Sequence, residues 1–275
     1  MVMSMEKRES TDRNEGKDLA WFLGLAFGIA WGGEGLLIIL YGLGILPEQG
    51  SAIHYICIAL LCGMAPTYAA LIVKHCRRGL TLKQIIKNDC SLKNVRLSFA
   101  MLGIFFILQI VVNQLLENRT DFSWILSPIA LIVMIFGGGL EEVGWRGIMQ
   151  PVFFKKLPFA AAAAIQGVLW ALWHLPLWFI PNTSQSGMSF TAFLTYCVAF
   201  CFALSVLYRI TESVAACVLL HAWGNTCQML FTMNTLQEAP SYRALAVFAG
   251  WIAASLLVCR LVICGMKYIE NKKFV

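Results

Sequence analysis

The sequence predicts an all-α fold, a polytopic membrane bundle of about eight transmembrane helices with both termini in the cytoplasm. Of the 275 residues, 59% are hydrophobic and only 13% are charged, a composition typical of membrane proteins rather than soluble globules. Apolar segments recur at the length of about 20 residues that a helix needs to cross the hydrocarbon core. The basic residues lie mainly in alternate connections between these segments.

Eight apolar segments meet that length, and each is expected to form one membrane-spanning helix. They cover about residues 19–46, 52–73, 96–115, 124–146, 159–180, 190–208, 213–231 and 244–266. The connections contain helix-breaking residues, for example in Pro47–Gly50 and Pro181–Gly187. The longest polar connection, Lys74–Asn94, mixes leucine and isoleucine with basic residues, which predicts a short amphipathic helix on the membrane surface.

The distribution of lysine and arginine predicts the orientation in the membrane. Of the 21 such residues, 18 lie in the two tails and in the connections on one side. The connections on the other side contain only Arg119 and Arg243, and Arg260 lies near the inner end of the last span. Because cytoplasmic connections are enriched in basic residues, both termini are expected in the cytoplasm, which requires an even number of spans.

The sequence divides into one membrane domain with two short tails. Residues 1–18 are polar and are expected to form a cytoplasmic tail without a cleaved signal peptide. Residues 19–266 form the membrane domain, whose core motifs lie in 124–231, and residues 267–275 form a second cytoplasmic tail. We expect a multi-pass protein of the cell membrane.

Three short polar strings interrupt the apolar segments: Glu141–Arg146, Trp170–His174 and His221–Asn225. A single charge at the bilayer centre costs about 2.5–3.5 kcal/mol, and such groups usually face one another or a water-filled cavity. We therefore expect one polar site built from all three strings, opening to the cytoplasm.

Helical spacing assigns different roles to the two adjacent glutamates. Glu142 and Arg146 are four residues apart with the acid first, which favours an ion pair on one helix face. Glu141 is turned from Glu142 by about 100° and is expected to point into the cavity, where it could act as a general base. An ion pair of this kind, considered alone, could equally serve packing.

The other two strings each combine a histidine with a partner one turn away. Trp170 shares a helix face with His174, so its indole is expected to shield the imidazole from lipid. His221 and Asn225 also share a face, which suits hydrogen-bond donation to an oxyanion or, alternatively, a metal ligand with its orienting neighbour. Each string alone would fit an interhelical hydrogen bond, whereas the three together favour catalysis.

The predicted depths of these groups differ. Glu141 falls near the inner end of its span, and His174 lies about 20 Å deeper in the next one. They can meet if the helix of Glu141 continues towards Gln150, or if the first turns of the next span lie outside the core. Gly137–Gly139 and Pro176 make bends in both helices plausible.

The three strings resemble the E-E-x-x-x-R, F/W-x-x-x-H and H-x-x-x-N motifs of the CPBP family. This family includes type II CAAX prenyl endopeptidases and lysostaphin-resistance-protein-A-like proteins. Supporting similarity extends over Ala65–Thr67, Arg78–Gly79, Gln166–Pro176 and Val218–Asn225. The resemblance implies an intramembrane endopeptidase that cuts near the membrane-bound end of a protein or peptide substrate, in CAAX-type processing.

The resemblance also implies roles for individual residues. Glu141 with His174 would activate water, and His221 with Asn225 would stabilise the oxyanion. The supporting residues would be Glu142, Arg146 and Trp170. The family is often described as metalloproteases, and zinc bound by Glu141, His174 and His221 would leave an open position for water. The sequence leaves both zinc-bound water and a metal-free glutamate base as alternatives.

Two other classes of function compete with proteolysis. A non-catalytic immunity or scaffold protein could keep this fold, although no residue of the motifs is lost here. A proton-coupled transporter could use Glu34 and Glu141 as a relay, but it predicts repeated halves that the sequence does not contain. The expected partners are the lipid bilayer and a membrane-anchored or prenylated substrate, with no nucleic acid.

Overall fold

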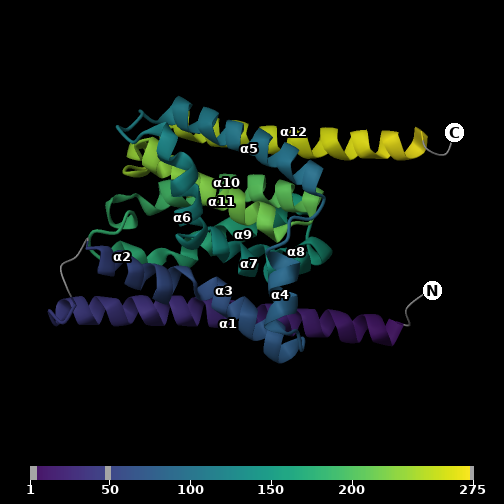
Figure 1. Cartoon of the computed structure of the whole chain (residues 1–275), viewed down its shortest axis with the longest axis horizontal. Helices are drawn as coiled ribbons and strands as arrows, with labels where there is room; N and C mark the ends of the chain where they lie inside the picture. Colours follow the sequence, from purple (N-terminus) through teal and green to yellow (C-terminus); the bar gives the residue numbers. More distant parts are fainter. Residues whose placement is uncertain (1–4, 47–50, 273–275) are drawn as a thin grey trace.

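The computed structural model describes residues 5–46 and 51–272, and within them the chain is a bundle of helices (Figure 1). The described residues contain no β-strand, only an isolated antiparallel bridge between Arg119 and Phe231. The predicted all-α membrane fold is therefore confirmed. The predicted break at Pro47–Gly50 lies outside the described residues.

The α-helices follow one another from α1 to α12 along the chain. Their bounds are α1 Met5–Gly42, α2 Ala52–Ile58, α3 Ala65–Ile72, α4 Leu82–Asp89, α5 Val95–Leu116, α6 Ser127–Phe136, α7 Glu142–Gly144, α8 Gln150–Lys156, α9 Phe159–Trp173, α10 Phe190–Thr211, α11 Val214–Leu230 and α12 Tyr242–Lys272. Short π-helical turns at 59–63 and 145–149 join α2 to α3 and α7 to α8, and a third at 73–77 extends α3. The predicted surface helix in the Lys74–Asn94 connection is α4, which begins with a capping box between Thr81 and Gln84.

The number of membrane spans differs from the predicted eight. Within the described residues, six helical stretches are long and apolar enough to cross a membrane: Asn14–Gly42, Ala52–Arg77, Val95–Leu116, Phe159–Phe179, Phe190–Thr211 and Tyr242–Met266. The pair Trp124–Phe136 and Gly139–Lys156 raises this number to seven if it forms one span bent by 42°.

The remaining predicted span, 213–231, is the helix α11, which has only 17 residues. None of its residues is exposed, and all are buried except the partly buried Leu219, Asn225, Gln228 and Met229. Its hydrophobic sequence therefore reflects burial in the bundle as much as contact with lipid. A count based on hydropathy alone does not distinguish these two environments.

The two terminal helices are the longest, and Figure 1 shows both extending beyond the bundle on the same side. The polar segment 1–18 is helical from Met5 and continues without a break into the first span. The arrangement of both termini in the cytoplasm stays a prediction.

The buried centre of the bundle is α10, which contacts α9, α11 and α12. Bulky side chains such as Phe200 and Leu204 are fully buried there. This central helix supports α9 and α11, which carry the second and third polar strings.

A break between α6 and the following helical segment lies at Gly137–Gly138. Gly138 has a φ of +141°, a conformation that residues with a Cβ atom rarely adopt. The chain then continues through α7 and the π-helical turn 145–149 to Lys156. The predicted bend and the continuation past Gln150 are both confirmed, and they bring Glu141 and the second string together.

Candidate active site

Glu142 is the central charged residue of the site. Its Oε2 forms an ion pair with Arg146 Nη1 at 3.0 Å, and its Oε1 accepts a hydrogen bond from His221 Nδ1 at 2.7 Å. Both Glu142 and Arg146 are completely buried. The predicted Glu142–Arg146 ion pair is therefore present, and the same carboxylate also connects α7 with α11.

The bond to Glu142 fixes the orientation of His221. Because Nδ1 is engaged with the carboxylate, Nε2 is the ring atom that remains for chemistry. A carboxylate on one nitrogen orients an imidazole and stabilises its protonated form. Sequence reasoning did not find this contact, because the two residues lie 79 positions apart.

Glu141 is held by Trp170. One carboxylate oxygen, Oε2, accepts from Trp170 Nε1 at 2.8 Å, and the residue is 4% exposed. The indole also packs edge-on against the rings of His174 and His221, at centroid distances of 5.4 Å and 5.1 Å. Trp170 therefore shields His174 as predicted, and in addition it positions the carboxylate of Glu141.

His174 caps the C-terminus of α9, and its Nδ1 bonds the carbonyl oxygen of Trp170 at 2.8 Å. A carbonyl can only accept, so Nδ1 carries the proton and Nε2 of the neutral ring is left with its lone pair. The ring lies among Trp170, Trp173 and Phe193. This arrangement suits a hydrogen-bond acceptor.

Three site residues converge beside Gly138. A Cβ atom at this position would contact Asn225 Nδ2 and would lie 3.3 Å from His221 Nε2 and 3.6 Å from Glu141 Oε1. Asn225 is oriented by its own bond, in which Nδ2 donates to the carbonyl of Gly137 at 3.1 Å. Because residue 138 is glycine, a space remains between Glu141 Oε1, His221 Nε2 and Asn225 Nδ2.

The backbone of the glutamate motif is supported by α3 and the π-helical turn after it. Thr67 Oγ1 donates to the carbonyl of Leu140 at 2.7 Å, and Lys74 Nζ donates to the carbonyl of Val143 at 3.4 Å. The sequence resemblance includes the segment Ala65–Thr67, but it assigned no role to Thr67. These two bonds hold the chain on either side of Glu141 and Glu142.

Close packing also requires glycine in the motif itself. A Cβ atom at Gly144 would lie 2.5 Å from the carbonyl oxygen of Pro66 and 2.6 Å from the ring of Phe22. A residue with a side chain at 144 would therefore force α1 and α3 away from the motif.

The charges of the site do not balance without a proton. Glu141 and Glu142 contribute two carboxylates, and Arg146 contributes one guanidinium. Lys74 also approaches the motif, but its ammonium is paired with Asp89 at 2.6 Å. One further proton, on a histidine or on Glu141, would make the buried site neutral. The site can therefore hold a proton that moves between these groups during a reaction.

Glu34 is not connected to these residues by any hydrogen bond described here. It lies on α1 and is 1% exposed, and its Oε2 has no hydrogen-bond partner among the described residues. Its predicted role in a proton relay with Glu141 gains no support from these contacts.

The site residues meet only part of the requirements of zinc. Zinc could accept two imidazole nitrogens and one carboxylate as ligands, and Glu142 would orient His221 as such a ligand. In the part of the chain that the structure describes, however, no three His, Cys, Asp or Glu side chains are arranged so that they could hold a metal ion. As placed, Glu141, His174 and His221 do not fit a metal centre.

The fold and the site define a class of protein, a multi-pass helical membrane protein with a buried glutamate–histidine–asparagine site. Residues 123–227, which contain all three polar strings, match the family model described as type II CAAX prenyl endopeptidase Rce1-like. A curated relative, CAAX prenyl protease 2 of Methanococcus maripaludis, is 24% identical over 184 residues. That match covers 61% of this chain and 60% of the relative, less than two thirds of its length. The resemblance to the type II CAAX prenyl endopeptidases is confirmed.

Proposed function

We propose that this protein is an intramembrane endopeptidase. It hydrolyses a peptide bond near the membrane-bound end of a protein or peptide substrate, in a reaction of the CAAX-processing type. The observation that carries the proposal is the convergence of Glu141 Oε1, His221 Nε2 and Asn225 Nδ2 beside Gly138. The matching of this segment to the Rce1-like family supports the same reaction class.

Glu141 is the general base of the proposed reaction. A water molecule between Glu141 and the scissile carbonyl gives one proton to Oε1 as its oxygen attacks the carbonyl carbon. His174 Nε2 accepts the second hydrogen of this water and orients it. Trp170 keeps Oε2 of Glu141 engaged, so that Oε1 is the oxygen that faces the reaction.

His221 and Asn225 stabilise the negative charge that develops on the carbonyl oxygen. Asn225 donates through Nδ2, and protonated His221 donates through Nε2 while Glu142 balances its charge through Nδ1. When the C–N bond breaks, the leaving nitrogen takes the proton from Glu141. The products are a carboxylic acid and an amine, and the base is restored.

The buried setting of these groups supports a substrate that is itself attached to the membrane. Glu141 and His174 are 4% and 8% exposed, so the attacking water must enter the bundle to reach them. We propose that the site opens to the cytoplasm and that the protein resides in the cell membrane. The substrate is membrane-anchored or prenylated, the chemistry that the name of the curated relative indicates for that relative.

The test is cleavage by purified protein in proteoliposomes of a fluorogenic peptide with a farnesylated CAAX end, beside the same peptide without the prenyl group. The wild-type protein and the Glu238→Gln control, which changes an exposed glutamate, should cleave it. Glu141→Gln should not. Binding of the peptide without cleavage of either form would favour the alternative, a non-catalytic immunity or scaffold protein.

A further inference from the structure

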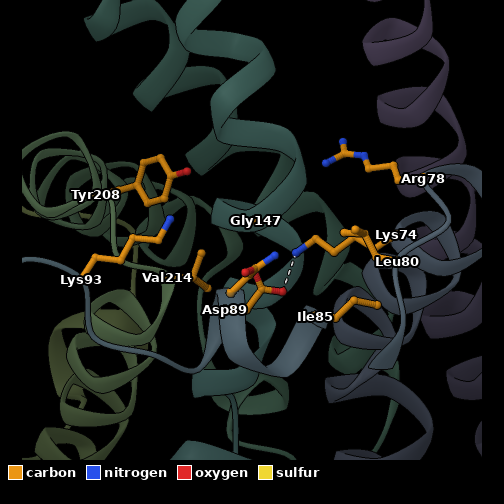
Figure 2. Close-up of a pocket in the computed structure, with 10 residues that line it drawn as sticks. Lys74, Arg78, Leu80, Ile85, Asp89, Lys93, Gly147, Tyr208 and Val214 are labelled. Carbon is orange, nitrogen blue, oxygen red and sulfur yellow. Dashed lines mark hydrogen bonds and ion pairs between the residues drawn. The ribbon is translucent and has the colours of Figure 1, made fainter. Parts of the chain in front are cut away.

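A second polar cavity lies apart from the candidate active site, with a volume of about 350 Å³. Its walls come from the turn after α3, from α4 and the segment that follows it, from the π-helical turn at Gly147 and from the ends of α10 and α11 (Figure 2). Most of these elements belong to connections that the basic residues assign to the cytoplasmic side. In the predicted orientation, the cavity lies near the cytoplasmic surface of the membrane.

The cavity carries a net positive charge. Three cationic side chains line it, Lys74, Arg78 and Lys93, against the single carboxylate of Asp89. Lys74 and Asp89 neutralise one another at a distance of 2.6 Å, and both are buried. The carboxylate of Glu212 lies near Tyr208 but is not part of the lining.

The two other cations are not balanced to the same extent. Arg78 and Arg77 share one carboxylate, Asp18, with N–O distances of 2.9 Å and 2.7 Å. Lys93 forms no ion pair among the described residues. Figure 2 shows the ammonium of Lys93 and the hydroxyl of Tyr208 near each other on one side of the cavity, with Arg78 on the opposite side.

We propose that this cavity binds a phosphate-bearing anion, supplied by the headgroup of an anionic phospholipid or by free phosphate. Lys93 and Tyr208 donate to the phosphate oxygens from one side, and the guanidinium of Arg78 faces them from the other. Such charge-assisted bonds are the usual basis of phosphate recognition. Anionic lipids of the cytoplasmic leaflet attract basic segments at this position, which favours the headgroup as a source.

The site would be close to the glutamate motif. Lys74, in the floor of the cavity, also donates to the carbonyl of Val143, next to Glu142. A Cβ atom at Gly147 would lie 2.6 Å from Lys74 Nζ, so this wall of the cavity is the helix that continues from the motif. The cavity therefore borders the same ion pair that supports the motif backbone.

The experiment measures binding rather than catalysis. Protein released from mixed phosphatidylglycerol and phosphatidylcholine vesicles is analysed by native mass spectrometry for retained lipid, and thermal stability in detergent is measured against inorganic phosphate. The variants are Lys93→Gln and Tyr208→Phe. The matched control is Lys83→Gln, which removes an exposed charge from α4 outside the cavity.

Wild-type protein and the Lys83→Gln control should retain phosphatidylglycerol over phosphatidylcholine, and each cavity variant should weaken that retention about tenfold. Retention lost in the variants identifies the headgroup as the source. Stabilisation by inorganic phosphate that is lost in the variants, without selective lipid retention, identifies free phosphate. Equal behaviour of wild type, control and both cavity variants in the two assays would overturn the proposal.

Discussion

Glu142 and His221 lie 79 residues apart in the chain, yet the Oε1 and Nδ1 atoms are separated by 2.7 Å. The contact joins the first polar string to the third inside the bundle. Because Glu142 also binds Arg146, one carboxylate determines the position of a cation on its own helical segment and of an imidazole on α11.

Replacing Glu141 by glutamine should abolish proteolysis and leave the fold intact. The carboxamide keeps the volume and can still accept from Trp170 Nε1, but it cannot take a proton from water. Loss of a general base lowers turnover by about 10²–10⁴-fold. Turnover on a membrane-anchored peptide and thermal stability measure the two effects, and near-normal turnover would contradict the assigned role.

Replacing Glu142 by glutamine should instead lower both stability and activity. Arg146 is completely buried and would lose its counter-charge, and breaking a buried pair costs about 3–5 kcal/mol. The double variant Glu142→Gln/Arg146→Gln should recover part of the stability but not the activity, because His221 still lacks its carboxylate. Denaturation and turnover assays of the single and double variants test this. Identical effects of Glu141→Gln and Glu142→Gln on both quantities would show that the division of roles is wrong.

Gly138→Ala should reduce activity strongly, because the new methyl group would enter the space between Asn225, His221 and Glu141. The positive φ of this residue adds backbone strain. Gly137→Ala is the matched control, since the nearest atom to its Cβ is the flexible Met134 Sδ and its φ is negative. Comparable turnover of the two variants would argue against a reaction centre beside Gly138.

Removal of metal should leave the rate unchanged. The pairing of Asn225 with His221 resembles an oxyanion-binding pair more than a ligand shell, and Glu141 can act as base without a metal. His221→Ala should lower turnover about 10²–10³-fold, as for the loss of an oxyanion donor. Chelation, zinc repletion and metal analysis of the protein test this expectation. Stoichiometric zinc that tracks activity, and is lost in His174→Ala and His221→Ala, would establish the zinc alternative.

Cysteine labelling or reporter fusions should find both termini and the Lys74–Asn94 connection in the cytoplasm. The connection at Asn182–Gly187 should be accessible from outside. This pattern follows from the distribution of lysine and arginine. Termini on opposite faces would overturn both the predicted orientation and the proposed cytoplasmic opening of the site.

The sequence predicted those features that depend on one helix or on composition. The Glu142–Arg146 pair follows from the helical repeat, and the bend at Gly137–Gly138 follows from adjacent glycines. The contacts of Glu142 with His221 and of Glu141 with Trp170 could not be predicted, because helical spacing does not determine which faces of separate helices meet. The span 213–231 was predicted from hydropathy, although its helix α11 is short and largely buried in protein.

The burial of α11 has a consequence for the dependence of the protein on its lipid. No residue of α11 is exposed. In the most apolar stretch of α1, and likewise of α12, only 22% of the residues are buried inside the protein. A change in acyl-chain length therefore acts first on the outer helices, which can tilt to match a thinner or thicker bilayer. The positions of His221 and Asn225 are set by the Glu142 carboxylate and the Gly137 carbonyl, so their alignment should persist in membranes of different thickness.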